Sequence, residues 1–309
     1  MKKLYAYFAC ISLICFISSC KKQEVSSTDF FDEAAIHTDD QARFSTDIDA
    51  IANDVNIALE MTPGFSGKTA SILGSVCDAT IIADTVSNPR SITITYNGTG
   101  CLTNRKRTGM IKITMDANTR WKNPGAEINV SFINLRITRL KDNKDMVFNG
   151  KFRFTNVSGE LISDLASVSN VTHTILSDDI DIIFDNGKEW SWKTARKRVY
   201  RQDNGIVIFT TGTQSGGGII GIGDWGNTRA GQPFLTQILL PLESREDCNF
   251  RVVRGKIEII LTDRLYATGN LGRDETGSPI SCPGANSYWL ELTWRDPTGT
   301  RCVLRLPYE

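Results

Sequence analysis

Eight cysteines occur in this chain of 309 residues, and Cys20 lies in the sequence context with the clearest chemical meaning. The chain starts with Met1-Lys2-Lys3, continues with the apolar run Leu4–Ile17 and then reads Ser18-Ser19-Cys20. That run suits a signal-peptide core and is shorter than the roughly 20 residues of a membrane helix. An aliphatic residue, two small residues and a cysteine form the pattern at which bacterial lipoprotein signals are cleaved. We therefore predict a signal peptide over 1–19 and lipid on the Cys20 thiol; an ordinary signal peptide or uncleaved anchor is the alternative.

Five cysteines follow this segment, and export to an oxidising compartment favours disulfides among them. The odd number leaves one thiol that stays free or pairs between molecules. We predict that Cys77 bonds Cys101, because a turn near 87–89 could return the chain between the two strand-like segments that they flank. Among Cys248, Cys282 and Cys302 we predict one bond and one free thiol, with Cys282 the preferred member of the pair. No Cys-x-x-Cys or His-x-x-x-His spacing occurs, so we predict no metal and no other cofactor.

The residues suited to catalysis are few. His37 and His173 are the two histidines of the chain, and neither lies near a Gly-x-Ser-x-Gly nucleophile motif. We therefore predict no catalytic residue. An enzyme that acts on polysaccharide through two carboxylates remains an alternative, because such pairs are defined by their separation in space and have no fixed sequence spacing.

Tryptophans beside cations are the candidates for ligand binding. Trp190 and Trp192 alternate along a predicted strand, and Trp225 lies in a glycine-rich segment. The strand continues into a cationic stretch that contains Lys193, Arg196, Lys197, Arg198 and Arg201. Such a surface could stack a sugar or hold an anionic glycan or a lipid head group. In the alternative, both strand tryptophans face the core and the cations form a solvated strand face.

The elements that would position these residues begin with a helix. Residues 20–37 are polar and without a period, as in a tether, and a helix is predicted over 38–62. Thr38 and Gln41 have the spacing of a capping box, and Pro63-Gly64 ends the helix. Apolar residues recur every three to four positions, at Phe44, Ile48, Ile51, Val55 and Leu59. Because the opposite face is acidic, we expect the stripe to pack on the rest of the protein; a helix that binds a partner or a membrane surface is the alternative.

From Thr80 onward the apolar period is two, as in Ile92, Ile94 and Tyr96, which indicates half-buried antiparallel strands. The phase slips between Phe132 and Ile133, as a β-bulge requires. We predict a mainly β fold: an antiparallel curved sheet, a sandwich or an open barrel, with one N-terminal helix. The β-rich body spans 63–309, as one unit or as two halves divided near 158–170.

Several of these strand and turn segments are similar to those of a known group of proteins. The segments Ser91–Cys101, Arg107–Ile113, Thr155–Gly159 and Cys248–Gly255 together resemble a family of uncharacterised β-rich lipoproteins from Bacteroidota. The resemblance covers most of the chain after the leader. It implies location and fold, and it implies no catalytic residue.

One short motif agrees with this resemblance to lipoproteins of Bacteroidota. Asp84-Thr85-Val86 resembles the O-glycosylation signal of Bacteroidota, in which Asp precedes Ser or Thr and a small apolar residue. Thr85 is therefore a candidate for glycosylation, and a position in a buried strand is the alternative.

The overall charge gives no global attraction to nucleic acid, because 35 Lys and Arg balance 35 Asp and Glu. We therefore expect a non-catalytic lipoprotein, anchored in the bacterial cell envelope through the lipid on Cys20. The expected location is the outer membrane, facing the periplasm or the cell surface. Its expected partners are a glycan, a lipid or an envelope protein, and not nucleic acid. The carboxylate-dependent enzyme and a purely structural envelope component are the competing hypotheses.

Overall fold

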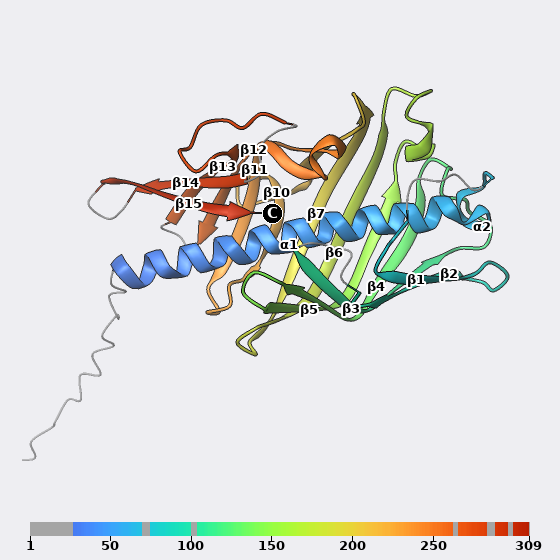
Figure 1. The fold of residues 1–309 in the computed structure, drawn as a ribbon, viewed down its shortest axis with the longest axis horizontal. Coiled ribbons are helices and arrows are strands. Elements are labelled where there is room, and N and C mark those ends of the chain that lie inside the picture. Colours follow the sequence, from blue (N-terminus) through green and yellow to red (C-terminus); the bar gives the residue numbers. More distant parts are fainter. Residues whose placement is uncertain are drawn as a thin grey trace, which may run out of the picture.

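The protein is mainly β, with a long helix near its N-terminus. The computed structural model describes residues 27–69, 75–99, 104–261, 265–282, 288–295 and 299–308. The long helix is α1 (Ser27–Met61), and the single-turn helix α2 (Pro63–Ser66) follows it. The strands form one antiparallel sheet, and α1 runs along its length (Figure 1). These features confirm the predicted fold class, and the change from α1 to α2 confirms the predicted helix end at Pro63.

The sheet has fifteen strands in the described part of the chain, and most of them pair in sequence order. The path runs from β1 to β7, then through β10 to β15, while β8 pairs with β7 and β11 and β9 pairs with β10. The strand bounds are β1 Ala79–Asp84, β2 Arg90–Asn97, β3 Arg105–Met115, β4 Ala126–Arg139, β5 Lys144–Asn156, β6 Val171–Phe184, β7 Glu189–Gln202, β8 Ile206–Gly212, β9 Gln214–Gly216, β10 Ile219–Asn227, β11 Pro233–Arg245, β12 Arg251–Leu261, β13 Leu265–Arg273, β14 Tyr288–Arg295 and β15 Arg301–Tyr308.

The sheet curves around α1, because strands near both ends of the path, β2 and β15, contact the same helix. All five residues of the predicted apolar stripe, from Phe44 to Leu59, are buried. They share one hydrophobic core with strand residues that extend from Ile92 in β2 to Leu292 in β14. The expectation that this helix packs against the β body is confirmed.

The start of α1 differs from the prediction. The helix begins at Ser27, so residues 27–37 belong to it and not to a tether. His37 packs on Phe234 with ring centroids 4.3 Å apart, and Glu33 accepts a hydrogen bond from Thr228 at 3.0 Å. The predicted capping box is also wrong, because Thr38 lies inside the helix and donates to the Ala34 carbonyl at 2.7 Å. Contacts with residues distant in sequence stabilise this helical segment, which has no apolar period of its own.

A line of β-bulges bends the long central strands. In β4, Phe132 and Leu135 are buried with two exposed residues between them, and the register against β5 shifts there. This confirms the predicted bulge. Gly109 of β3 lies opposite, at φ +98°, and a Cβ atom on it would be 2.2 Å from the carbonyl oxygen of Asn134. Similar register shifts occur between β5 and β6 and between β6 and β7. Aligned bulges of this kind curve a sheet.

The segment 158–170 is a connection within one unit. It contains the short 3-10 helix η1 (Ile162–Asp164) and joins β5 to β6, which pair with each other. The main core includes residues from strands on both sides of this segment. Of the two predicted possibilities, a long loop or a domain boundary, the structure has the loop. A second 3-10 helix, η2 (Glu246–Cys248), joins β11 to β12.

Candidate functional site

The three tryptophans that the sequence singles out do not form one surface. Trp192 is fully buried, packs on Phe44 and Phe234 at centroid distances of 5.0 and 4.7 Å, and donates to the Asn227 carbonyl at 2.7 Å. It therefore offers no free ring face to a ligand. Trp190 is half-buried on the same face of β7. Trp225 is paired with Lys193 and so points to the opposite face.

The cations that follow these tryptophans are divided between the two faces of β7. Lys197 and Arg201 are exposed, as expected of a solvated face, but Arg196 and Arg198 are each 1% exposed. Arg196 donates to both carboxylate oxygens of Asp224, at 3.1 and 2.6 Å. Burial alone lowers the pKa of Arg196, but the charges of Asp224 and Asp49 outweigh it, so the pKa stays above its ordinary value. The alternative, with tryptophans in the core and cations on a solvated face, therefore holds for Trp192, Lys197 and Arg201. It does not hold for Arg196 and Arg198, which are buried beside Asp224 and Asp49.

The acidic face of α1 explains why arginines can be buried. Arg107 of β3 donates to Asp54 of α1 at 2.7 Å and to both oxygens of Asp78 at 2.6 and 2.8 Å. The Tyr96 hydroxyl adds a hydrogen bond to Asp54 at 2.7 Å. Burial lowers the pKa of Arg107, and its carboxylate partners raise it further than burial lowers it. The acidic face of α1 is therefore an internal surface that binds the sheet through ion pairs.

The same arrangement recurs along the helix. Each of three further carboxylates of α1 contacts an arginine of the sheet or its loops, in the pairs Asp39–Arg139, Asp40–Arg229 and Asp47–Arg105, with shortest distances of 2.6, 2.5 and 2.6 Å. Asp39 and Asp47 lie about two helical turns apart on α1, and each carboxylate is engaged by an arginine. These ion pairs connect successive turns of the helix to the sheet.

A mostly apolar pocket lies between α1 and the strands β11 to β15. Its cavity volume is about 40 Å³, and the empty space is about 570 Å³ when the part open to solvent is included. On the helix side, Ala42, Ser45 and Thr46 are small and leave the space open. The sheet side is formed by the paired Arg196 and Asp224 and by large aliphatic side chains, among them Ile238, Leu242, Ile257, Ile259, Leu271 and Leu290. We call this the apolar pocket.

Two polar atoms in the apolar pocket have no hydrogen-bond partner in the described part of the protein. They are Oε1 of Gln41 and Oγ1 of Thr236, on residues that are 4% and 2% exposed. The amide nitrogen of Gln41 donates to Asp224 at 2.7 Å, which fixes the direction of this side chain. Leaving a buried polar group unsatisfied costs about 1 to 3 kcal/mol. A ligand or water that bonds these atoms would recover that free energy.

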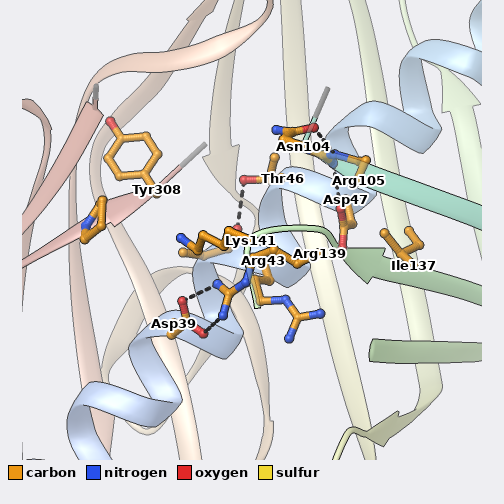
Figure 2. A pocket seen from close by; sticks show the side chains of 12 residues that line it. Asp39, Arg43, Thr46, Asp47, Asn104, Arg105, Ile137, Arg139, Lys141 and Tyr308 are labelled. Carbon is orange, nitrogen blue, oxygen red and sulfur yellow. Dashed lines mark hydrogen bonds and ion pairs between the residues drawn. The ribbon is translucent and has the colours of Figure 1, made fainter. Parts of the chain in front are cut away.

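A second, more open pocket adjoins the first, and we call it the cationic pocket (Figure 2). Its empty space is about 440 Å³, including open solvent, and four cations and two carboxylates line it: Arg43, Arg105, Arg139, Lys141, Asp39 and Asp47. Ala42, Thr46 and Tyr308 line both pockets. The Tyr308 hydroxyl donates to the Val252 carbonyl at 2.6 Å and accepts from the Gly272 amide at 2.7 Å, so the shared wall is firmly held.

Neither histidine takes part in these pockets. His37 and His173 are each 1% exposed, and their ring nitrogens make no hydrogen bond to the described residues. Burial lowers the pKa of each imidazole to about 3, with the charge of Arg198 adding to the effect at His173. Both rings are therefore neutral at pH 7 and pack as aromatic groups, His173 between Trp121 and Tyr200.

The last three cysteines of the chain form one disulfide and leave one free thiol. Cys248 and Cys282 form a disulfide with a Cα–Cα distance of 6.1 Å, and Cys302 is a free thiol. This is the one bond and one thiol expected of the three. Asp247 lies beside that disulfide, but both sulfur atoms are engaged and cannot act as thiolate ligands. Cys77 is disulfide-bonded, while Cys101 lies outside the described residues, so their pairing stays a prediction. Cys20 lies outside the described residues as well.

Thr85 lies in the connection between β1 and β2 and is exposed, and the neighbouring Val86 is 92% exposed. The carboxylate of Asp84 accepts hydrogen bonds from the backbone amides of Val86 and Ser87, at 3.0 and 3.1 Å. The alternative of a buried strand position is therefore removed. Glycosylation of Thr85 stays a prediction.

Of the residues that line the two pockets, only Arg196 belongs to the binding candidates predicted from the sequence. The available signal was the set of small residues at Ala42, Ser45 and Thr46, which interrupts the large side chains along α1. Small residues on a helix usually indicate close packing, so this signal alone does not predict a cavity. The cavity depends on strands about 200 residues away in sequence, whose positions no local pattern specifies.

No helix among the described residues is both long and apolar enough to cross a membrane. The sequence matches no protein-family model and no curated protein, and the fold matches no solved structure. The resemblance to Bacteroidota lipoproteins therefore stays a prediction, and any function must be argued from the site itself.

Proposed function

We propose that this protein is a non-catalytic binding protein of the bacterial cell envelope that holds a lipid-like apolar ligand between α1 and strands β11 to β15. Its anchor would be the lipid on Cys20. The observation that carries the proposal is the apolar pocket, in which aliphatic walls enclose the unpartnered Gln41 and Thr236. A concave apolar site with a few convergent polar groups is the usual form of a small-molecule site.

Two competing functions have less support. A carboxylate-dependent enzyme would need two acidic groups free to exchange protons, whereas Asp39 and Asp47 in the cationic pocket and Asp224 in the apolar pocket are each paired with an arginine. A purely structural component would need no internal space, and unsatisfied polar atoms beside such a space would only reduce its stability. Binding a ligand accounts for both the space and the atoms.

The test is binding of a neutral apolar fluorophore, N-phenyl-1-naphthylamine, to the purified mature protein. We expect saturable binding with enhanced fluorescence. The Ala42→Phe variant places a ring at the wall shared by the two pockets, and we expect it to lower the affinity at least tenfold. The matched control is Ala35→Phe, which lies two helical turns earlier at a half-buried position that does not line either pocket.

A melting curve of each variant shows whether it is folded. Loss of binding in Ala42→Phe with unchanged melting temperature and normal binding in Ala35→Phe would support the apolar pocket as the site. Absence of saturable binding by the wild-type protein, or equal binding by folded Ala42→Phe, would overturn the proposal.

A further inference from the structure

We infer that the ligand is a single-chain amphiphile with an acidic head group, whose head binds in the cationic pocket while its chain enters the apolar pocket. This inference rests on the proposed function and specifies the chemistry of its ligand. The ligand chemistry follows from the two linings: one pocket is rich in cations, the other in aliphatic side chains, and the same three residues border both.

The cations of the cationic pocket are not equally available to a ligand. Arg139 is bound by Asp39 and by Asp142, and Arg105 is bound by Asp47. The remaining two cations are Arg43 and Lys141, and neither has an ion pair with any residue that the structure describes. Lys141 and Arg43 are therefore the two lining cations without a direct carboxylate contact among the described residues, although the charge of Arg43 also acts on Asp47 and Asp40. Burial raises the pKa of each of these two carboxyl groups, and the charge of Arg43 opposes that rise.

Arg43 is the more deeply buried of these two cations. Its residue is 8% exposed, one terminal nitrogen (Nη2) donates to the Lys144 carbonyl at 2.9 Å, and the other (Nη1) has no partner. A buried guanidinium normally has its charge paired and its N–H groups bonded. A carboxylate or phosphate oxygen beside Nη1 would provide both the charge and the acceptor. Lys141 is exposed and lies at the same pocket, where it can approach the head group from solvent.

Ala42 and Thr46 of the helix and Tyr308 of the sheet border both pockets, so a ligand that occupies both would lie against these three residues. Ala42 is adjacent to Arg43, and successive residues of a helix are turned by about 100° from each other. Arg43 can therefore hold the head while Ala42 and Thr46 border the chain where it enters the apolar pocket. Tyr308 forms the opposite side, and its two hydrogen bonds keep it in place. Inside, the chain would meet the aliphatic side chains of β11 to β14.

The experiment measures displacement of N-phenyl-1-naphthylamine from the full mature protein by palmitate, by hexadecanol and by acetate. Hexadecanol keeps the chain without the charge, and acetate keeps the charge without the chain. We expect palmitate to bind at least tenfold more tightly than hexadecanol, and acetate to displace nothing. Arg43→Gln should weaken palmitate about tenfold and Lys141→Gln about threefold, since exposed charge pairs contribute less than buried ones. Neither should change hexadecanol binding.

The control variant is Lys151→Gln, which removes an exposed lysine of β5 that lines neither pocket. It should bind palmitate as the wild type does. If Arg43→Gln melts at a lower temperature, the exposed Lys141→Gln variant still decides the point. Equal affinity for palmitate and hexadecanol, or no effect of Lys141→Gln on palmitate, would overturn the acidic head group and leave the proposed apolar site intact. Failure of every chain-bearing compound and of the fluorophore to bind would instead refute the proposed function.

Discussion

Arg107 shows what the buried ion pairs of α1 contribute to the fold. Its side chain is 5% exposed and makes three hydrogen bonds to the carboxylates of Asp54 and Asp78. Replacing such a pair with apolar groups can be neutral for stability, because bringing two charges out of water is costly. Removing only one partner is different, since it leaves a buried charge without compensation. The ion pairs therefore favour one position of the helix in the sheet, even where their net stabilisation is small.

We predict that Arg107→Gln lowers the free energy of unfolding by about 3 to 5 kcal/mol, because Asp54 and Asp78 would remain buried without a cation. Urea denaturation followed by circular dichroism measures this change. The matched control is Arg136→Gln, which removes an arginine that is 50% exposed and paired with Asp145. That change should cost less than about 1 kcal/mol. Equal costs in the two variants would contradict the interpretation of Arg107.

The burial of His173 predicts that the stability of the protein depends on pH. Its pKa is about 3 in the folded protein and 6.5 in an unfolded chain. As the pH falls below 6.5, the unfolded state takes up a proton that the folded state does not, so this residue reduces stability progressively down to about pH 3. At pH 5 the loss is about 2 kcal/mol. Above pH 7 the effect falls below about 0.2 kcal/mol.

In His173→Phe this part of the pH dependence should disappear. The ring nitrogens of His173 have no partner among the described residues, so phenylalanine removes no hydrogen bond there. We expect the difference in unfolding free energy between pH 7 and pH 5 to be about 2 kcal/mol smaller in the variant than in the wild type. His37→Phe should behave similarly, because burial alone lowers the pKa of His37 to about 3. The same dependence on pH in all three proteins would exclude this role.

At the scale of elements, the sequence predicted those features that depend on local periodicity. The strand of Ile92 and Ile94, the apolar stripe of α1 and the bulge after Phe132 all follow from alternation or helical spacing within one segment. The burial of the acidic helix face could not be predicted in the same way. Whether Asp54 faces water or Arg107 depends on a strand that is distant in sequence. The charge pattern of the helix describes its acidic face and does not show which part of the sheet that face contacts.

We predict that α1 unfolds only with the whole domain. Its apolar stripe from Phe44 to Leu59 is buried in the main core, and ion pairs hold the other face. Backbone amides in this part of α1 should therefore exchange with solvent as slowly as those of β5, at a rate set by global unfolding. Hydrogen exchange with mass spectrometry makes the comparison, with the mostly exposed edge strand β1 as the fast internal reference. Faster exchange in α1 than in β5 would mean that the helix opens separately from the sheet.

At the scale of the whole molecule, one curved sheet around one helix creates a site that no single element contains. The cationic pocket combines residues of α1, β3, β4 and β15, and the apolar pocket combines α1 with later strands of the sheet. The sequence identified cations and aromatic residues as the chemistry of binding, but the cations that line the cationic pocket come from other segments. These cations lie close together because the sheet is curved, and aligned bulges and tertiary packing together determine that curvature.

The start of α1 limits how far the folded body can lie from a membrane to which Cys20 is anchored. Because α1 begins at Ser27, the chain from Cys20 to that residue can span at most about 25 Å. A lipid on Cys20 would therefore hold the folded body close to the bilayer surface, where single-chain amphiphiles are available.

We predict that Cys20 carries this lipid, since it directly follows the pair Ser18-Ser19 at the end of the apolar leader. Metabolic labelling with a radioactive fatty acid should mark the wild-type protein and leave Cys20→Ala unmarked. Cys302→Ala, which removes the free thiol of the described region, is the matched control and should be labelled normally. Equal labelling of Cys20→Ala and the wild type would show that the lipid, if any, is attached elsewhere.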